Sequence, residues 1–95
     1  MRAIMTIKIG ALTYRVVRVK RIAGGARGEC DFAAKTIRVL EGLERDVENE
    51  TILHEVSHAI DPSMGEQKIH TFSNRFYQVL VDNPMFTRRY YKPLK

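Results

Sequence analysis

The sequence predicts an α+β fold, in which a small antiparallel sheet of about four strands is followed by two helices packed on one face. Apolar and polar residues alternate through most of residues 1–42, as in half-buried strands, whereas residues 43–95 carry apolar residues at helical spacing. Strands that precede helices without interleaving favour this antiparallel arrangement. A chain of 95 residues has room for one domain, so we expect both regions to share a single core.

The strand region begins with a predicted hairpin. Residues 5–9 alternate in polarity, and Gly10-Ala11 then occupies the place of a two-residue turn with glycine first. Alternation resumes at Leu12, but its parity changes at Val16-Val17, where two apolar residues are adjacent. A parity change within a strand predicts a bulge or a twist, and not the end of the strand.

Two shorter strands are predicted after a flexible loop at residues 23–26. They are residues 29–32 and 36–40, and Ile37 and Val39 lie on one face of the second. We expect the 36–40 strand to supply an edge of the sheet, to which an extended peptide binds as an additional strand.

Two helices are predicted in the rest of the chain. The first runs from about Asp46 to Asp61, where Pro62 ends it, and the second from about Met64 to Asp82. Acidic residues early in the first helix suit the helix dipole. The apolar residues at helical spacing, which we expect to be buried, are Leu53, Val56 and Ile60 in the first helix and Ile69, Phe72, Phe76, Val79 and Leu80 in the second.

The first predicted helix contains the motif His54-Glu55-Val56-Ser57-His58, an H-E-x-x-H pattern. Residues four apart lie on the same face of a helix, so both imidazoles are able to bind one tetrahedral Zn²⁺ ion. Glu55 is offset from this pair and suits a general base toward a water on the metal, whose pKa zinc lowers to about 7. The motif therefore predicts a catalytic zinc site. A chance pair of surface histidines and a purely structural zinc site are the alternatives.

A catalytic zinc site needs a third protein ligand, and three residues compete for this role. Asp61 follows His58 by three positions, at the helix end, where it also suits an acceptor for a ligand histidine's second nitrogen. Glu66 opens the second helix and faces His58 if the chain turns back sharply between the helices. His70 lies one turn beyond Glu66 on the same face. Glu66 also has a structural explanation, because Ser63 to Glu66 fit a capping box.

Residues 51–60 resemble the zinc helix of the ImmA/IrrE-type metallopeptidases, in particular the short versions common in phages and mobile elements. In that family a glutamate on the following helix is the third zinc ligand, in a pattern similar to E-x-x-A-N-x-F-A. Residues 66–73 match this pattern in spacing, with Ile69 in place of the alanine and His70 in place of the asparagine. Residues 76–84 also resemble the phage-type subgroup, whereas the strand region matches only in layout.

The resemblance implies a minimal zincin-like domain, with His54, His58 and Glu66 as zinc ligands and Glu55 as catalytic base. It also implies substrates such as protein regulators or repressors of a mobile element. The asparagine replaced by His70 departs from the family pattern and leaves that histidine a role at the edge of the site.

Composition favours the cytoplasm. No apolar run is long enough to span a bilayer, and the first residues lack the continuous apolar core of a signal peptide. The single cysteine, Cys30, cannot form an internal disulfide, which fits a reducing compartment.

A net charge of +5 and a pI near 9.7 introduce the alternative of weak nucleic-acid binding. Positive residues are densest at 15–21, which we expect at an exposed strand edge, and at 88–92. The sequence as a whole predicts a zinc-dependent peptidase acting on a peptide or protein partner. The alternative is a regulatory module that retains the metal site and binds a protein or nucleic acid, and only the peptidase needs the Glu55 carboxylate.

Overall fold

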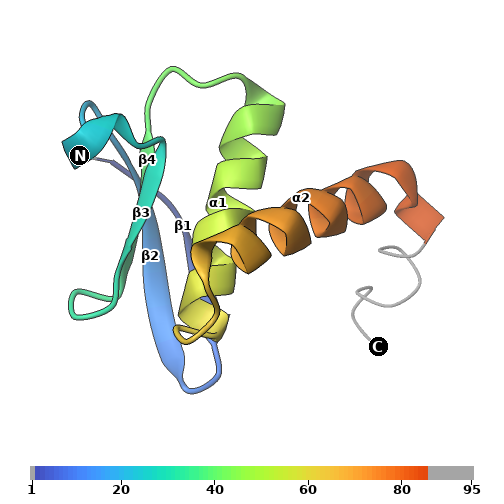
Figure 1. Cartoon of the computed structure of the whole chain (residues 1–95). Helices are drawn as coiled ribbons and strands as arrows, with labels where there is room; N and C mark the ends of the chain where they lie inside the picture. The colour runs from blue at the N-terminus through green and yellow to red at the C-terminus, as the bar shows by residue number, and fades with distance from the viewer. Residues whose placement is uncertain (1, 86–95) are drawn as a thin grey trace, which may run out of the picture.

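The computed structural model describes residues 2–85 and has the predicted α+β arrangement, with four strands followed by two helices (Figure 1). The strands are β1 (Arg2–Ile9), β2 (Leu12–Val19), β3 (Gly28–Asp31) and β4 (Thr36–Leu40), with a 3-10 turn, η1 (Ala23–Gly25), between β2 and β3. The helices are α1 (Arg45–Ile60) and α2 (Glu66–Asp82). The fold class is thereby confirmed.

The sheet is mixed and not wholly antiparallel, which corrects one part of the prediction. Its strand order is β1-β2-β4-β3. β1 with β2 and β3 with β4 are antiparallel, but β2 with β4 are parallel. After β2 the chain passes through η1 to the outer edge, and the β3–β4 hairpin then folds back so that β4 lies beside β2. Side chains alternate in the same way in both kinds of ladder, so polarity alone does not reveal strand direction.

β4 lies inside the sheet, so the expectation that residues 36–40 form an edge is wrong. Ile37 and Val39 are fully buried and Thr36 is 4% exposed. Such burial is that of a strand with neighbours on both sides, and it removes the two apolar side chains from water. The edges of the sheet are β1 and β3.

A bulge is present in the β1–β2 hairpin, but its extra residue lies on β1 and not at Val16-Val17 as expected. Val17 is paired with Ala3 and Val16 with Met5, so Ile4 has no counterpart on β2. β2 itself pairs with β4 in unbroken register, so Val16 and Val17 lie on opposite faces of the sheet, and both are buried.

The main core lies between the sheet and α1. Its buried residues are Tyr14, Val16, Ile37, Val39 and Ile52. The predicted apolar stripe of α1 is wrong in part, because Leu53 and Val56 are only half-buried and Ile60 is 64% exposed. α1 contacts the sheet on one side and α2 on another, so its buried residues do not follow a single stripe.

α2 crosses α1 and packs mainly against that helix (Figure 1). Ile69 and Ser73 are its buried residues, and the hydroxyl of Tyr77 donates to Asp46 in the first turn of α1 at 2.7 Å. Phe72, predicted to be buried, is 49% exposed. One face of α2 is therefore left open by the described residues. No helix between residues 2 and 85 combines the length and apolar character needed to cross a membrane.

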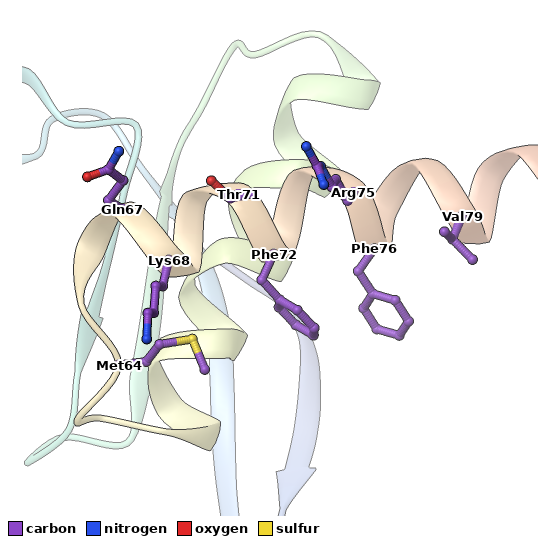
Figure 2. A pocket seen from close by; sticks show the side chains of 8 residues that line it. All are labelled: Met64, Gln67, Lys68, Thr71, Phe72, Arg75, Phe76 and Val79. Atoms are coloured by element: carbon purple, nitrogen blue, oxygen red, sulfur yellow. The ribbon is translucent and has the colours of Figure 1, made fainter.

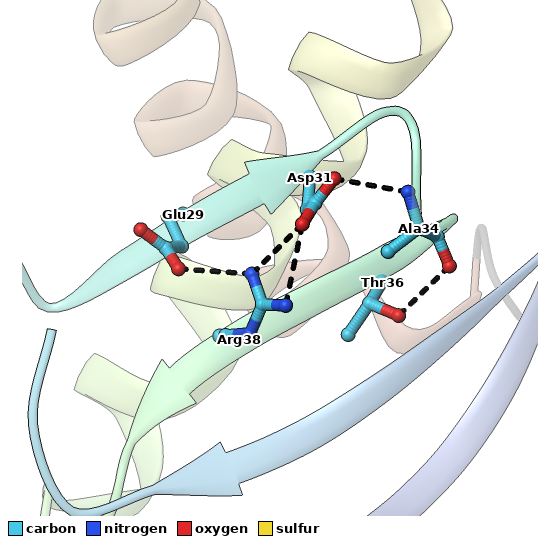
Figure 3. Close-up of polar contacts among 5 residues, drawn as sticks. All are labelled: Glu29, Asp31, Ala34, Thr36 and Arg38. Atoms are coloured by element: carbon cyan, nitrogen blue, oxygen red, sulfur yellow. Dashed lines mark hydrogen bonds and ion pairs between the residues drawn. The ribbon is translucent and has the colours of Figure 1, made fainter.

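The face of the sheet opposite α1 carries an ionic cluster (Figure 3). Arg38 of β4 donates to Glu29 at 3.0 Å and to Asp31 at 3.3 Å, both on β3. The backbone N–H of Ala34 also donates to Asp31, and this bond together with Arg38 holds the pKa of the Asp31 carboxyl below its ordinary value. These contacts fix the β3–β4 hairpin and hence the edge strand that faces α1.

β3 and α1 approach each other closely at Gly28. A Cβ atom at this position would lie 2.6 Å from Thr51 Cγ2 and 3.2 Å from Glu55 Cγ, both on α1. Glycine within a strand is typical of such an approach. The missing side chain at Gly28 therefore lets α1 hold Glu55 directly against β3.

A second connection joins β2 to α1. Arg18 donates two hydrogen bonds to the Glu48 carboxylate, at 2.7 and 2.8 Å, and these lower the pKa of Glu48. Arg18 belongs to the basic stretch 15–21, of which residues 15–19 lie on β2. β2 has neighbours on both sides, so the expectation that this stretch occupies an exposed strand edge is wrong.

Gly28→Ala is expected to lower the free energy of unfolding by about 1–3 kcal/mol, because the added methyl group overlaps Thr51. Urea denaturation measures this loss. Adding Thr51→Ser removes the overlapping methyl group but keeps the hydroxyl that bonds to Val47, so the double variant regains part of the stability. Gly65→Ala is the matched control, because nothing lies within 4 Å of its Cβ position. Equal losses at both glycines would contradict the close approach.

Glu48→Gln is expected to destabilise the protein at neutral pH but not in acid. The folded pKa of Glu48 is lowered, so its stabilisation is present above the unfolded pKa of about 4.3 and is lost as the pH falls through the folded value. Unfolding measured from pH 7 to pH 3 tests this: the difference from wild type shrinks toward zero in acid. Glu44→Gln, an exposed change at the same end of α1, keeps the wild-type pH profile.

Candidate metal centre

A tight turn brings the start of α2 back over the end of α1. The N–H of Met64 donates to the backbone oxygen of Asp61, the C-cap of α1, at 3.1 Å. α2 then begins at Glu66, with Gly65 as its N-cap. The sharp reversal that would bring Glu66 to His58 is therefore present.

The Glu66 carboxylate bridges two histidines of α1. Its Oε1 lies 2.7 Å from His54 Nε2, and its Oε2 lies 2.8 Å from His58 Nε2. The two imidazole rings are one helical turn apart, with centroids separated by 5.0 Å. One ligand atom from each of the three residues lies within 4.8 Å of the other two. The structure thus brings together the three residues that the sequence proposed as metal ligands.

The donor set suits Zn²⁺. Two imidazole nitrogens and one carboxylate oxygen are the protein ligands of a His₂Glu catalytic site, in which the fourth position stays open. Ligand atoms around a tetrahedral zinc with bonds of about 2.0–2.1 Å are about 3.4 Å apart, which is within the span of this cluster. His54 and His58 have side chains only 16% and 18% exposed, whereas Glu66 is 73% exposed and closes the site from outside.

Local charges keep Glu66 ionised. Burial raises its pKa, but the hydrogen bond from His54 and the charges of both histidines outweigh this effect and hold the pKa of the Glu66 carboxyl below its ordinary value. The ionised carboxylate is the form that binds a metal ion.

Glu55 lies between the metal-ligand face of α1 and β3. It is only 7% exposed, and its carboxylate has no hydrogen bond to any described residue, unlike the bridging carboxylate of Glu66. No buried side-chain polar atom of residues 2–85 lacks a partner, so the unbonded oxygens of Glu55 must reach solvent in the cleft. Burial raises the pKa of this carboxyl, although the neighbouring charges of His54 and His58 lower it.

Two hollows flank the cluster, and Gly28, Glu55 and Glu66 line both of them. The first has a volume of about 240 Å³, and its other lining residues are Ala26, Arg27, Glu50, Thr51, His54 and His70. The second has a volume of about 350 Å³, and its other lining residues are Glu29, Cys30, Phe32, His58, Pro62 and Met64. The edge strand β3 therefore runs along a cleft with the candidate metal ligands in its middle.

Asp61, the second candidate for third ligand, lies outside the cluster. Its Oδ1 accepts hydrogen bonds from the N–H and the hydroxyl of Ser63, at 3.1 and 2.6 Å, and these bonds lower the pKa of Asp61. The capping box that would explain Glu66 structurally is also not formed, because Gly65 is the N-cap and Glu66 contacts the histidines. Ser63 therefore bonds to Asp61 within the turn and does not cap the start of α2.

His70 lies beside the cluster and not in it. Its ring centroid is 6.2 Å from that of His54, and it lines the smaller hollow. The Asn74 amide lies between His70 and Glu50, 3.4 Å from His70 Nε2 and 2.7 Å from the Glu50 carboxylate. This position agrees with the expected place of His70 at the edge of the site.

The sequence did not identify the residues of β3, or those just before it, as part of the cleft. Gly28 sits inside a strand, and a glycine at such a position is a recognisable sign of close backbone approach. Arg27 had no comparable signal, because an isolated arginine is ordinary on a surface. Tyr77, whose phenol bonds to Asp46, lies at the other end of α1 from His58 and is not part of the cleft.

Zinc content distinguishes the three candidates for third ligand. Purified wild type is expected to hold about one zinc per chain, and His54→Ala with His58→Ala none, as measured by elemental analysis. Glu66→Ala is expected to weaken zinc binding more than about 100-fold, since loss of an outer-shell partner alone costs about 10- to 100-fold.

The matched controls are Asp61→Asn and His70→Ala, which remove the competing groups. Both are expected to retain about one zinc per chain, because neither side chain supplies an atom to the cluster. Zinc lost from Asp61→Asn but kept by Glu66→Ala would contradict the ligand set.

Comparison of the chain with protein-family models, curated proteins and solved structures finds no match. The likeness of the helical region to ImmA/IrrE-type metallopeptidases therefore stays a resemblance of motif and spacing. The candidate centre is supported by its own geometry, namely two histidines, a bridging glutamate and an unbonded buried glutamate.

Proposed function

We propose that this protein is a zinc-dependent peptidase that hydrolyses peptide bonds in a protein partner, with His54, His58 and Glu66 as metal ligands. The single observation that carries the proposal is the position of Glu55, which is buried beside the ligand pair without a hydrogen-bond partner among residues 2–85. Its side chain is almost wholly buried, which costs free energy for a carboxylate, yet its oxygens open to the cleft and make no structural hydrogen bond. A catalytic base needs its oxygens free.

Zn²⁺ bound by these ligands supplies Lewis-acid activation of water and of the peptide carbonyl. Glu55 is the residue to which we assign the proton transfers: its carboxylate takes the proton of the attacking water and delivers it to the leaving amine. A carboxyl whose pKa is raised by burial matches this task better than an ordinary exposed one, because general catalysis is most efficient near the working pH. Arg27 and His70 line the adjacent hollow, and we assign to them the role of side-chain donors to the reacting carbonyl.

The edge strand β3 supports an extended peptide as the substrate. Arg27 accepts a hydrogen bond from the N–H of Leu40, so the alternation of an antiparallel pair turns the backbone groups of Gly28 and Cys30 away from β4. Both residues line the cleft beside Glu55. A peptide that adds to this edge as a strand would pass across the candidate ligands. β3 thus takes the role that the sequence had assigned to residues 36–40.

The cytoplasm is the compartment we assign to this activity. One cysteine in 95 residues fits a reducing environment, and burial raises the pKa of the Cys30 thiol to about 11, which keeps it unreactive beside a metal site. Regulators of a mobile element remain the substrate class that the family resemblance suggests.

A regulatory binding module is the second candidate function. The exposed apolar face of α2 favours it, because such faces mark interaction sites. Nucleic acid has weaker support as the partner: within the basic stretch 15–21, Arg18 is paired with Glu48, and residues 88–92 lie outside the described part of the chain.

Glu55→Gln separates the two functions. The change keeps the side-chain size and removes the base, so zinc content is expected to stay near one per chain while the turnover number falls by about 10²–10⁴-fold. Cleavage of a mixed library of quenched-fluorescent peptides measures the activity. Glu41→Gln, an exposed change away from the cleft, is the control and is expected to leave turnover unchanged. Equal cleavage by wild type and Glu55→Gln, or none by either, would remove the peptidase proposal.

A further inference from the structure

The side of α2 that faces away from α1 forms an apolar groove (Figure 2). Phe72 and Phe76 project from the same side of the helix, and Met64, from the turn before α2, points toward Phe72. The two phenyl rings are stacked with centroids 5.5 Å apart, and Val79 continues the surface toward the end of the helix. The groove has a volume of about 760 Å³, and Phe72 and Val79 are 49% and 37% exposed.

The groove carries positive charge and no negative charge. Lys68 and Arg75 line it, on opposite sides of α2 in Figure 2, and its remaining polar residues are the uncharged Gln67 and Thr71. Neither cation has an ion-pair or hydrogen-bond partner among residues 2–85, whereas Arg18 and Arg38 are paired. An apolar strip bordered by unpaired cations is complementary to an apolar strip bordered by carboxylates.

Two other occupants fit this charge pattern poorly. A second copy of the chain has a net charge of +5, and the same groove on it would present the same cations. The chain's own segment 86–95 contains Arg88, Arg89, Lys92 and Lys95 and no acidic residue. Like charges brought together in either way oppose binding.

We propose that the α2 groove binds an acidic amphipathic helix of a protein partner. The groove residues Lys68, Phe72, Arg75 and Val79 follow one another at spacings of four, three and four, which is the repeat that an opposing helix meets. Apolar side chains of the partner pack on Phe72 and Phe76, and its carboxylates pair with Lys68 and Arg75. Met64 lines both this groove and the larger hollow beside His58, so a docked partner lies next to the cleft.

The test uses the full chain and a fluorescent synthetic helical peptide, with leucine at every third or fourth position and glutamate on both sides of the leucine strip. Fluorescence anisotropy measures its affinity. We expect binding that weakens with salt and that falls at least about tenfold in Lys68→Glu with Arg75→Glu. The same double variant should bind a matched peptide, with lysine in place of glutamate, more tightly than wild type does.

Apolar contact is tested separately. Phe72→Ser is expected to weaken the glutamate peptide about tenfold, whereas Val81→Ser, a change of another exposed apolar residue of α2 outside the groove, leaves the affinity unchanged. Circular dichroism and zinc content equal to wild type show that each variant is folded. Glu55→Gln is expected to bind the peptide like wild type, so docking is judged independently of peptidase activity.

Three results would overturn the proposal. Equal affinity of the wild-type protein for the lysine and glutamate peptides would show that charge does not select the partner. A wild-type dimer in sedimentation experiments, abolished by Phe72→Ser, would identify a second copy as the occupant. A tenfold tighter binding after Tyr90→Ser with Tyr91→Ser in the full chain would identify segment 86–95 as the occupant.

Discussion

The contact between β3 and α1 at Gly28 is the constraint on which the rest of the site depends. With no side chain at Gly28, Thr51 and Glu55 come within van der Waals distance of the strand backbone. The position of α1 against β3 then decides which face of the helix meets the cleft. It therefore also decides that His54 and His58 lie beside the cleft. The salt links of Arg38 hold β3 to β4 from the other face of the sheet, so the edge strand is stabilised from both sides.

A second constraint is the short turn between the helices. In this turn the Ser63 hydroxyl donates a hydrogen bond to Asp61, and α2 begins without a side-chain cap. The Glu66 carboxylate is therefore available to bridge His54 and His58. A residue that a local rule assigns to helix capping is thus used for a contact between helices. The site gains three converging ligand atoms, whereas the start of α2 loses a stabilising hydrogen bond worth about 1 kcal/mol.

The candidate metal centre and the α2 groove both arise from the way in which α2 crosses α1. The first turns of α2 contribute Glu66 and His70 to the cleft, while the opposite side presents Phe72 and Val79 to solvent. Helical periodicity marked Phe72 and Val79 as buried because an apolar stripe is the usual sign of a core face. A partner surface has the same periodicity, since its apolar residues are buried only when the partner binds.

The sequence by itself determined the four strands, the two helices and the motif, because each depends on residues close together in the chain. It also proposed Glu66 with His54 and His58, through spacing and resemblance. Only the tertiary structure decided that β4 lies parallel to β2 inside the sheet and that β3 is the edge beside Glu55. These arrangements depend on which distant segments meet, and neither polarity alternation nor helical spacing encodes that choice.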